Sequence, residues 1–422
     1  MRTPFVREQR IVVPGIASAH SHAFQRALRG RAQASRARRD AGATGASFWS
    51  WRGLMYALAE RVTPEELYAL SHYAFVELAS AGVTCVGEFH YLQHDRGGRP
   101  YGERTLLADT VIRAALDAGL RITLLRVAYL RAGLGRALEP AQHRFVDGSI
   151  DETLRDLESL AARWAHEPRV RIGLAPHSVR AVPREALFAC AQFARERSMP
   201  LHAHVSEQRR EVRECIAEHG RRPVELLSEV GVISERFSAV HATHLDTHEA
   251  RLLGEARAYV CVCRTTERDL GDGLPNLAAL AAHGARFTTG TDSHASADPF
   301  EEARAMELDE RTRAEAREVA FDAQGLVAAL GRDAYASLGF DLDTLDDGLE
   351  LDARDPAIDA LVERDSSEAV HNALAWQATS RAVRSVRVAG REIVKGGRHV
   401  ALDAARGGYE TAIRALLARA RV

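Results

Sequence analysis

The sequence predicts an α/β fold in which eight parallel strands close into a (β/α)8 TIM-type barrel with a small β appendage. Short β-branched runs alternate with helical patterns along most of the 422 residues, and this alternation is typical of a parallel sheet. Eight repeats are the number that closes a barrel. Because the chain exceeds the ~250–300 residues at which one core usually stops growing, a smaller second unit is expected.

Eight segments are predicted as barrel strands, namely 15–22, 83–90, 121–130, 170–178, 200–206, 238–245, 258–264 and 286–293. Helical patterns separate them. The clearest helix follows Thr63, with Pro64 at its first position and Glu66 closing a capping box. It is expected to run to Gly82, a natural C-cap. Two more helices are expected over about 104–119 and 150–165.

The two ends of the chain are predicted to lie outside the barrel. Residues 1–13 are interpreted as a residual part of the β appendage, with a strand only over 10–13. The barrel is assigned to 14–340, and 341–422 to a C-terminal β appendage with a terminal helix. Within that last part, the runs 383–388 and 391–396 predict a hairpin, and about 411–421 predicts the helix.

Charge and cysteine content exclude several classes of protein. A formal net charge of −2 argues against a general nucleic-acid binder. No apolar run is long enough to span a bilayer, and the run 11–13 is too short for a signal-peptide core. The five cysteines form no CxxC pair and no disulfide framework, which predicts a reducing cytoplasmic location.

The motif His20-Ser21-His22 is the most informative feature of the sequence. Histidines two apart on a strand point to the same face and can bind one metal ion together. An isolated pair is a weak signal. It gains weight because other predicted strands also end in such groups, and barrel active sites lie at the C-terminal ends of the strands. These groups are His90, His177, His202-Ala203-His204, His241 and Asp292.

Three imidazoles and one carboxylate, from His20, His22, His204 and Asp292, form a reasonable ligand set for one Zn²⁺ per chain, although iron or another divalent ion could use the same ligands. A bound water would have its pKa lowered to roughly 7. Glu207 could then move a proton between that water and a leaving nitrogen. The alternative is that Glu207 and Gln208 simply cap the next helix and Asp292 starts a turn, but the whole set favours a metal centre.

Lysine usage bears on the number of metal ions. Lys395 is the only lysine, and it lies in the C-terminal region. A carboxylated lysine bridging two metals, or a Schiff-base lysine, is therefore nearly excluded, and the sequence favours a mononuclear site.

The order of these motifs resembles the amidohydrolase superfamily, with HxH after the first strand, histidines at the fifth and sixth, and aspartate at the eighth. The longer motifs HSHAFQR at 20–26, SFWSWR at 47–52 and EFHY at 88–91 resemble its formimidoylglutamate deiminase family. That family hydrolyses N-formimidoyl-L-glutamate to N-formyl-L-glutamate and ammonia in histidine degradation. The resemblance implies this reaction here, with metal-bound hydroxide attacking the formimidoyl carbon.

The resemblance also implies roles for single residues. It assigns zinc to the four ligands above, and proton-transfer or polarising roles to Glu207, His241 and Asp292. The positions that match its substrate contacts are Gln25, Arg52, Tyr91, His177 and Arg180. Arginine binds carboxylates in bidentate fashion, which suits a small dicarboxylate. For Arg52 the alternative is a surface salt bridge, although Trp49 and Trp51 favour a packed position; Arg180 could instead pair with a barrel carboxylate.

Two other functions stay open at this point. The site could deaminate another imino or amino compound, such as a nucleobase, although paired arginines favour an acid-bearing substrate. The chain could also be a metal-binding pseudoenzyme, against which the intact Glu207, His241 and Asp292 count. The resemblance implies a homodimer, while the balanced charge and the lack of a long apolar run predict no nucleic-acid or membrane partner. The arginine-rich stretch 29–39 is interpreted as a solvated loop, with a flap over an anionic substrate as the alternative.

Overall fold

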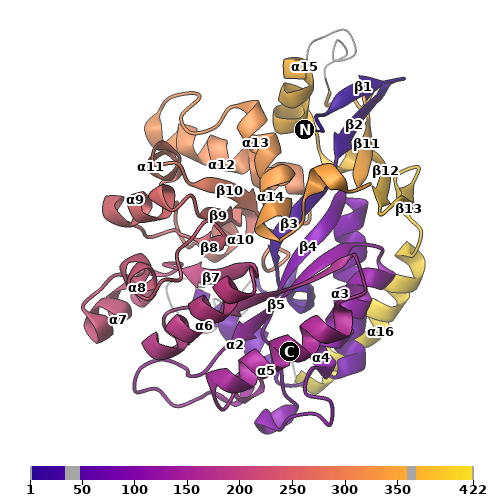
Figure 1. The fold of residues 1–422 in the computed structure, drawn as a ribbon. Coiled ribbons are helices and arrows are strands. Elements are labelled where there is room, and N and C mark those ends of the chain that lie inside the picture. Colours follow the sequence, from indigo (N-terminus) through magenta and orange to yellow (C-terminus); the bar gives the residue numbers. More distant parts are fainter. Residues whose placement is uncertain (1, 34–47, 359–366, 421–422) are drawn as a thin grey trace, which may run out of the picture.

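The computed structural model describes residues 2–33, 48–358 and 367–420. Eight parallel strands form one sheet in which each strand pairs with its neighbours in sequence (Figure 1). This confirms the predicted barrel. The strands are β3 (Ile16–Ser21), β4 (Val83–His90), β5 (Arg121–Ala128), β6 (Val170–Pro176), β7 (Leu201–Val205), β8 (Phe237–His241), β9 (Tyr259–Val262) and β10 (Arg286–Thr289).

The barrel closes between its first and last strands, at their C-terminal ends. Ser21 forms a parallel bridge with Asp292. The His22 amide donates to the Asp292 carbonyl at 2.9 Å, and the Asp292 amide donates to the His20 carbonyl at 3.1 Å. Gly290 permits this approach, because a Cβ there would lie 2.7 Å from the Cβ of His20. The backbone segments that close the barrel are therefore the same ones that carry His20, His22 and Asp292.

Helices cover the outside of the barrel, and the capping box at Thr63 is present at the start of α3 (Pro64–Ser80). Gly82 follows the helix end with a φ of +104°, a backbone conformation that favours glycine. The other helices are α2 (Phe48–Ala59), α4 (Leu106–Asp117), α5 (Ile150–Trp164), α6 (Arg184–Glu196), α7 (Arg209–His219), α8 (Pro223–Glu229), α9 (Thr247–Glu255), α10 (Arg264–Leu270), α11 (Leu277–Ala282), α12 (Pro299–Ala314), α13 (Ala323–Leu330), α14 (Arg332–Ser337), α15 (Ser367–Asn372) and α16 (Leu402–Ala420).

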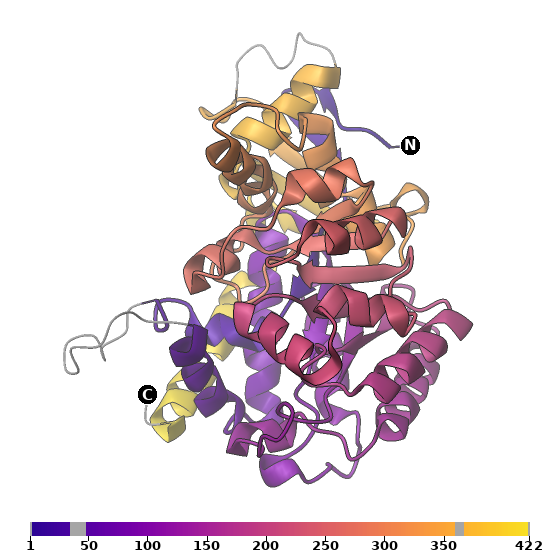
Figure 2. The same ribbon diagram turned by 90° about the vertical axis from the view of Figure 1, so that its left-hand side faces the viewer.

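A six-stranded antiparallel sheet joins the two ends of the chain, in the order β1-β2-β11-β12-β13-β14. Figure 2 shows the first strands beside the region of α15, at one end of the molecule. The predicted hairpin is formed by β12 and β13, but the expectation of a single N-terminal strand was wrong, because two strands are present and one of them pairs with β11. Their bounds are β1 (Phe5–Arg7), β2 (Arg10–Pro14), β11 (Gly348–Asp352), β12 (Val383–Val388), β13 (Arg391–Lys395) and β14 (Arg398–His399).

The last helix is longer than the sequence predicted. It begins at Leu402 rather than near residue 411, although Gly407 and Gly408 disfavour a helix. Packing outweighs that preference: α16 lies against α3 (Figure 1), and a Cβ at Gly408 would lie 4.0 Å from the Cβ of Ala69.

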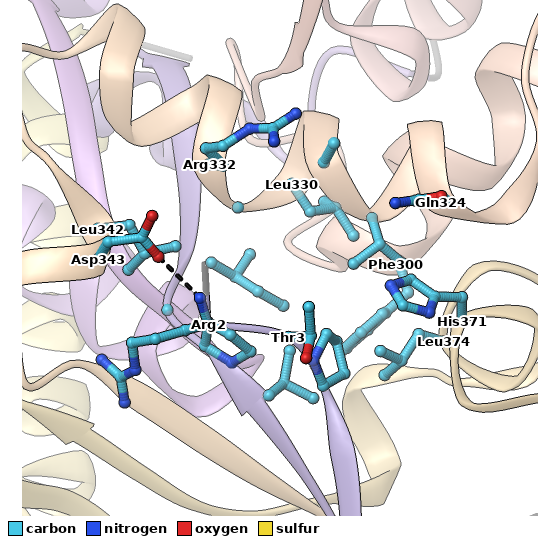
Figure 3. A pocket seen from close by; sticks show the side chains of 18 residues that line it. Arg2, Thr3, Phe300, Gln324, Leu330, Arg332, Leu342, Asp343, His371 and Leu374 are labelled. Atoms are coloured by element: carbon cyan, nitrogen blue, oxygen red, sulfur yellow. Dashed lines mark hydrogen bonds between the residues drawn. The ribbon is translucent and has the colours of Figure 1, made fainter. Parts of the chain in front are cut away.

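A pocket with about 760 Å³ of empty space, part of it open to solvent, lies between the small sheet and α13. Gly15, which precedes the first barrel strand, is one of its lining residues, so the pocket is at the N-terminal end of the barrel. Figure 3 shows the Arg2 amide bonded to Asp343 at one edge, at 2.8 Å. Most of the wall is apolar, from Val13, Ile16, Phe300, Val327, Leu330, Leu342 and Leu374.

Two further observations concern the chain as a whole. In the part that the structure describes, no helix combines the length and the apolar character needed to cross a membrane. All five cysteines are free and buried.

Candidate active site

The four predicted metal ligands form one buried cluster at the C-terminal end of the barrel. The ligand atoms of His20, His22, His204 and Asp292 all lie within 4.8 Å of one another. Oδ1 of Asp292 is 3.4 Å from Nε2 of His20 and 3.3 Å from Nε2 of His22. The fold therefore brings together side chains that are far apart in the sequence, from β3, β7 and the turn after β10.

Backbone carbonyls orient two of the imidazoles. Nδ1 of His22 donates to the Phe89 carbonyl at 2.9 Å, and Nδ1 of His204 donates to the His177 carbonyl at 3.1 Å. Burial, with the nearby His20, lowers the pKa of His22 to about 3, so this ring is neutral. With Nδ1 protonated, each ring presents the lone pair of Nε2 to the cluster, which is how histidine binds metals.

The remaining imidazole indicates what the cluster lacks. Both ring nitrogens of His20 are buried and find no hydrogen-bond partner among the described residues. Buried polar atoms without partners are costly and rare. A cation at the centre of the four ligands would supply a partner for Nε2, the nitrogen that lies near Asp292, so this donor set fits a divalent metal ion.

Three strands leave the barrel through strained backbone. Ser206 after β7, His241 at the end of β8 and Asp292 after β10 have φ values of +51°, +69° and +44°. Non-glycine residues seldom adopt this left-handed region, at a cost of order 1–3 kcal/mol each, and such strain clusters at functional sites. Here the strained residues lie at the strand ends, next to the side chains that form the cluster.

The two predicted proton carriers lie beside the ligands. Nε2 of His241 is 3.8 Å from Oε1 of Glu207 and 4.0 Å from Oδ2 of Asp292. Burial raises the pKa of Glu207, which the charge of His241 partly opposes. Burial also acts to lower the pKa of His241, but the surrounding carboxylates, with Glu207 first, outweigh it and hold this pKa well above its ordinary value.

The alternative role for Glu207, as a helix cap, does not match the structure. Gln208 is the N-cap of α7, and its side chain makes no capping hydrogen bond. Instead the Gln208 amide donates to Asp272, while Glu207 lines the pocket beside the cluster. Burial, reinforced by the charge of Glu207, raises the pKa of Asp272 to about 8.

A pocket with about 580 Å³ of empty space, part of it open to solvent, leads to the cluster. All five predicted substrate contacts line it, together with four aromatic residues that the sequence did not single out as contacts. The contacts are Gln25, Arg52, Tyr91, His177 and Arg180, and the aromatic residues are Tyr56, Tyr129, Phe145 and Trp51. Tyr129 lies near the end of the predicted strand 121–130, and this position is the sequence feature that could have identified it as a lining residue.

Two lining residues offer unused hydrogen-bonding atoms. Nε2 of Gln25 donates to the Tyr91 hydroxyl at 2.7 Å, while Oε1 of Gln25 is buried without a partner among the described residues. Nε of Arg180 is likewise buried, and it donates to no carboxylate of the described part of the chain. The pocket thus holds one acceptor and one donor that a ligand could satisfy.

Arg52 is both packed against an aromatic ring and paired with an exposed carboxylate, so both interpretations that the sequence left open apply. Its side chain is only 12% exposed, and its guanidinium carbon lies 4.7 Å from the centre of the Tyr56 ring. It also pairs at 3.4 Å with Glu139, whose side chain is 59% exposed. Exposed ion pairs contribute little free energy, so an incoming carboxylate can replace Glu139 at low cost. The side chain of Trp49 lies outside the described residues.

Some predicted groups lie elsewhere. His202 donates through Nε2 to the Ser337 carbonyl at 3.0 Å, deeper in the barrel, and His90 does not line the pocket. The sequence predicted no role for Glu88, which is part of the EFHY motif. Its carboxylate accepts hydrogen bonds from the Ser21 hydroxyl at 2.6 Å and the Ala23 amide at 2.8 Å, and these bonds fix the position of the His20–His22 segment. In the stretch 29–39, Arg29 donates to the His294 carbonyl, while residues 34–39 lie outside the described part.

The chain is similar to one family model, one characterised sequence and two solved structures. The sequence model of the Amidohydrolase family matches residues 11–352. Formimidoylglutamate deiminase from Pseudomonas aeruginosa is 38% identical over 92% of this chain and 85% of its own. A crystal structure of an amidohydrolase from Brucella melitensis has a TM-score of 0.87 at 31% identity, covering 98% of this chain and 95% of that one. A zinc-bound adenosine deaminase from Xanthomonas campestris shares the fold, with a TM-score of 0.80 at 22% identity over 98% and 87% of the two chains.

Proposed function

The chain belongs to the amidohydrolase family, and on that premise we propose that it is a zinc-dependent enzyme that hydrolyses N-formimidoyl-L-glutamate to N-formyl-L-glutamate and ammonia. The observation that carries the proposal is a pocket that joins a cluster of three histidines and one aspartate to two arginines. Its similarity to the Pseudomonas aeruginosa enzyme supports the substrate. Histidine degradation in the cytoplasm is the matching role, and five free, buried cysteines are compatible with it.

Recognition of the substrate follows from the pocket wall. Arg52 and Arg180 provide two guanidinium groups for two carboxylates, and the planar fork of arginine suits bidentate binding. The buried Oε1 of Gln25 needs a donor, which an N–H of the formimidoyl group supplies. Tyr91, held by Gln25 at 2.7 Å, adds a hydroxyl beside the same group.

His20, His22, His204 and Asp292 would hold the cation. Zn²⁺ bound by such ligands lowers the pKa of a water to near neutrality and so supplies a nucleophile. Asp292 offers Oδ2 on the side of His241, where it can accept the proton of the attacking water. Nε2 of His241 faces the same space and polarises the formimidoyl group under attack.

The water oxygen forms a bond to the formimidoyl carbon, and the bond from that carbon to the terminal nitrogen breaks. Both protons of the water end on that nitrogen, which leaves as ammonia. Glu207 lies within 3.8 Å of His241 at the pocket wall and delivers a proton to the nitrogen. The nitrogen that bears the glutamate keeps its bond to the carbon, because the proton from Glu207 goes to the terminal nitrogen instead.

The test is ammonia release by zinc-loaded protein, with N-formimidoyl-L-glutamate compared with N-formimidoylglycine, which has one carboxylate. Arg52→Ala and Arg180→Ala should each raise KM for the dicarboxylate by about 10–100-fold, as expected for a lost charged hydrogen bond of roughly 1.5–3 kcal/mol. Arg136→Ala is the matched control: Arg136 pairs with Glu214 and does not line this pocket.

Ammonia release that is insensitive to both arginines would overturn the proposed substrate pocket. No release from metal-replete protein would overturn the reaction itself. In that case adenosine is the next compound to test, because the zinc-bound neighbour of the same fold is an adenosine deaminase.

A further inference from the structure

A second carboxylate contacts His241 from the side away from the pocket. Glu267 lies in α10 (Arg264–Leu270), just after β9, and is fully buried. Its Oε1 is 3.1 Å from Nδ1 of His241 and also accepts from the Cys263 amide at 2.9 Å. Glu267 is not among the lining residues of the pocket, so it meets the substrate only through His241.

An arginine keeps Glu267 in its charged form. The buried Arg264 pairs with Oε2 of Glu267 and, at 2.6 Å, with Asp309. Burial acts to raise the pKa of Glu267, but the hydrogen bond from His241 and the charge of Arg264 outweigh it and lower this pKa. A carboxylate can only accept hydrogen bonds, so Nδ1 of His241 must carry a proton.

We propose that Glu267 is a positioning residue, which fixes His241 with Nδ1–H on the carboxylate and Nε2 directed at the reacting group. Among the described contacts, the bond to Glu267 at 3.1 Å is the hydrogen bond that the ring makes. Glu207 and Asp292 lie 3.8 and 4.0 Å from Nε2, beyond hydrogen-bonding distance, and the stacking on His204 at 5.4 Å tolerates rotation. The left-handed backbone of His241, with φ of +69°, places the ring but does not choose between its two nitrogens. Part of the test rests on the proposed function, because it uses ammonia release as one readout.

The kinetic test is Glu267→Gln, which removes the charge at nearly constant volume. By analogy with the loss of groups that orient metal-bound histidines, kcat should fall about 10–100-fold, with KM within about twofold and the zinc content unchanged. Glu267→Asp keeps a carboxylate for Arg264 but withdraws it from His241, and should show the same split between kcat and KM. This second variant keeps the test valid if the amide disturbs folding.

A double-mutant cycle separates positioning from structural support. If Glu267 acts through His241, then Glu267→Gln should change kcat less than about twofold in a His241→Gln background. Glu302→Gln is the matched control, since Glu302 is an equally buried carboxylate that accepts from the Thr265 amide and hydroxyl in the same helix. It does not touch His241, so its kcat should match the wild type. An undiminished effect of Glu267→Gln in the His241→Gln background, or an equal loss in Glu302→Gln, would overturn the proposal.

A readout without substrate distinguishes this inference from the proposed function. In protein labelled with ¹⁵N-histidine, the signal assigned by its loss in His241→Gln should show a protonated Nδ1, and Glu267→Gln should shift this signal. An Nδ1 that is unprotonated in the wild type, or unaffected by Glu267→Gln, would overturn the role of Glu267 even if ammonia is released normally.

Discussion

The two ends of the barrel carry pockets of comparable size but different chemistry. At the N-terminal end, a pocket with about 760 Å³ of empty space, part of it open to solvent, is lined mainly by apolar side chains. None of the buried side-chain atoms that lack a partner in the described residues belongs to this lining. At the C-terminal end, about 580 Å³ lies beside four metal-type ligands. There Gln25 and Arg180 each present a buried polar atom without a partner.

The difference teaches that buried polar atoms without partners, rather than empty volume, distinguish the candidate active site from the other pocket. An apolar gap between two packed units costs dispersion contacts but leaves no group in need of a partner. Buried nitrogens without partners, strained backbone at strand ends and closely packed titratable groups lower the stability of the fold much more. Among the described residues, all three features occur together only at the C-terminal end of the barrel. Three substitutions test this contrast.

Asp292→Asn should have the largest effect. The substitution keeps the size of the side chain and the backbone bonds that close the barrel, but removes a charged ligand and proton acceptor. We expect ammonia release to fall by about 10³-fold, within the range for lost acid–base groups, together with loss of zinc affinity. Turnover, metal analysis and calorimetry on the same sample would measure this. A variant that keeps both zinc and turnover would contradict the assignment of this end as the active site.

Leu330→Ala should have the opposite profile. Leu330 is 2% exposed beside the N-terminal pocket, so truncation enlarges an apolar void and should lower the free energy of unfolding by about 2–3 kcal/mol. Denaturant unfolding measures this change. Below the unfolding transition kcat/KM should equal that of the wild type, and Leu330→Met should recover most of the stability. A loss of turnover in folded Leu330→Ala protein would mean that the two ends are coupled.

Ala328→Val should have the smallest effect. Ala328 also lines the N-terminal pocket, so two added methyl groups enter space rather than a packed core. Their burial and the lower helix propensity of valine oppose each other, and the free energy of unfolding should change by less than about 1 kcal/mol. Thermal unfolding would measure the change. A much larger loss of stability would mean that the added methyl groups clash with neighbouring side chains instead of entering empty space.

Sequence periodicity and motif chemistry predicted most of the barrel. All eight strand segments were found in order, and one of them, β4, has the predicted bounds of 83–90. The four residues of the candidate metal cluster and five residues that line its pocket were also named from the sequence, because histidines and carboxylates at strand ends can only meet at one face of a barrel. The pairing of strands at the chain ends was harder to predict from the sequence. The strand β11 has only five residues, and its two buried leucines, Leu349 and Leu351, are too few to indicate a strand by their alternation.

Other parts of the site depend on contacts that no spacing encodes. Glu267 looks like one more charged residue in a short helix, yet folding buries it 3.1 Å from His241. The pairing of Arg52 with Glu139 across 87 positions of sequence is of the same kind. It arises from how the segments that carry these two residues pack at the end of the barrel.

By itself, then, the sequence determined which chemical groups this protein has and at which end of the fold they gather, since a local pattern sets each strand and the barrel topology sets the face at which the strands end. Only the tertiary structure decided which of those groups are neutral, charged, paired or left without partners. These states depend on burial and on distances of a few ångströms between side chains from different strands, and such distances exist only after the barrel has closed.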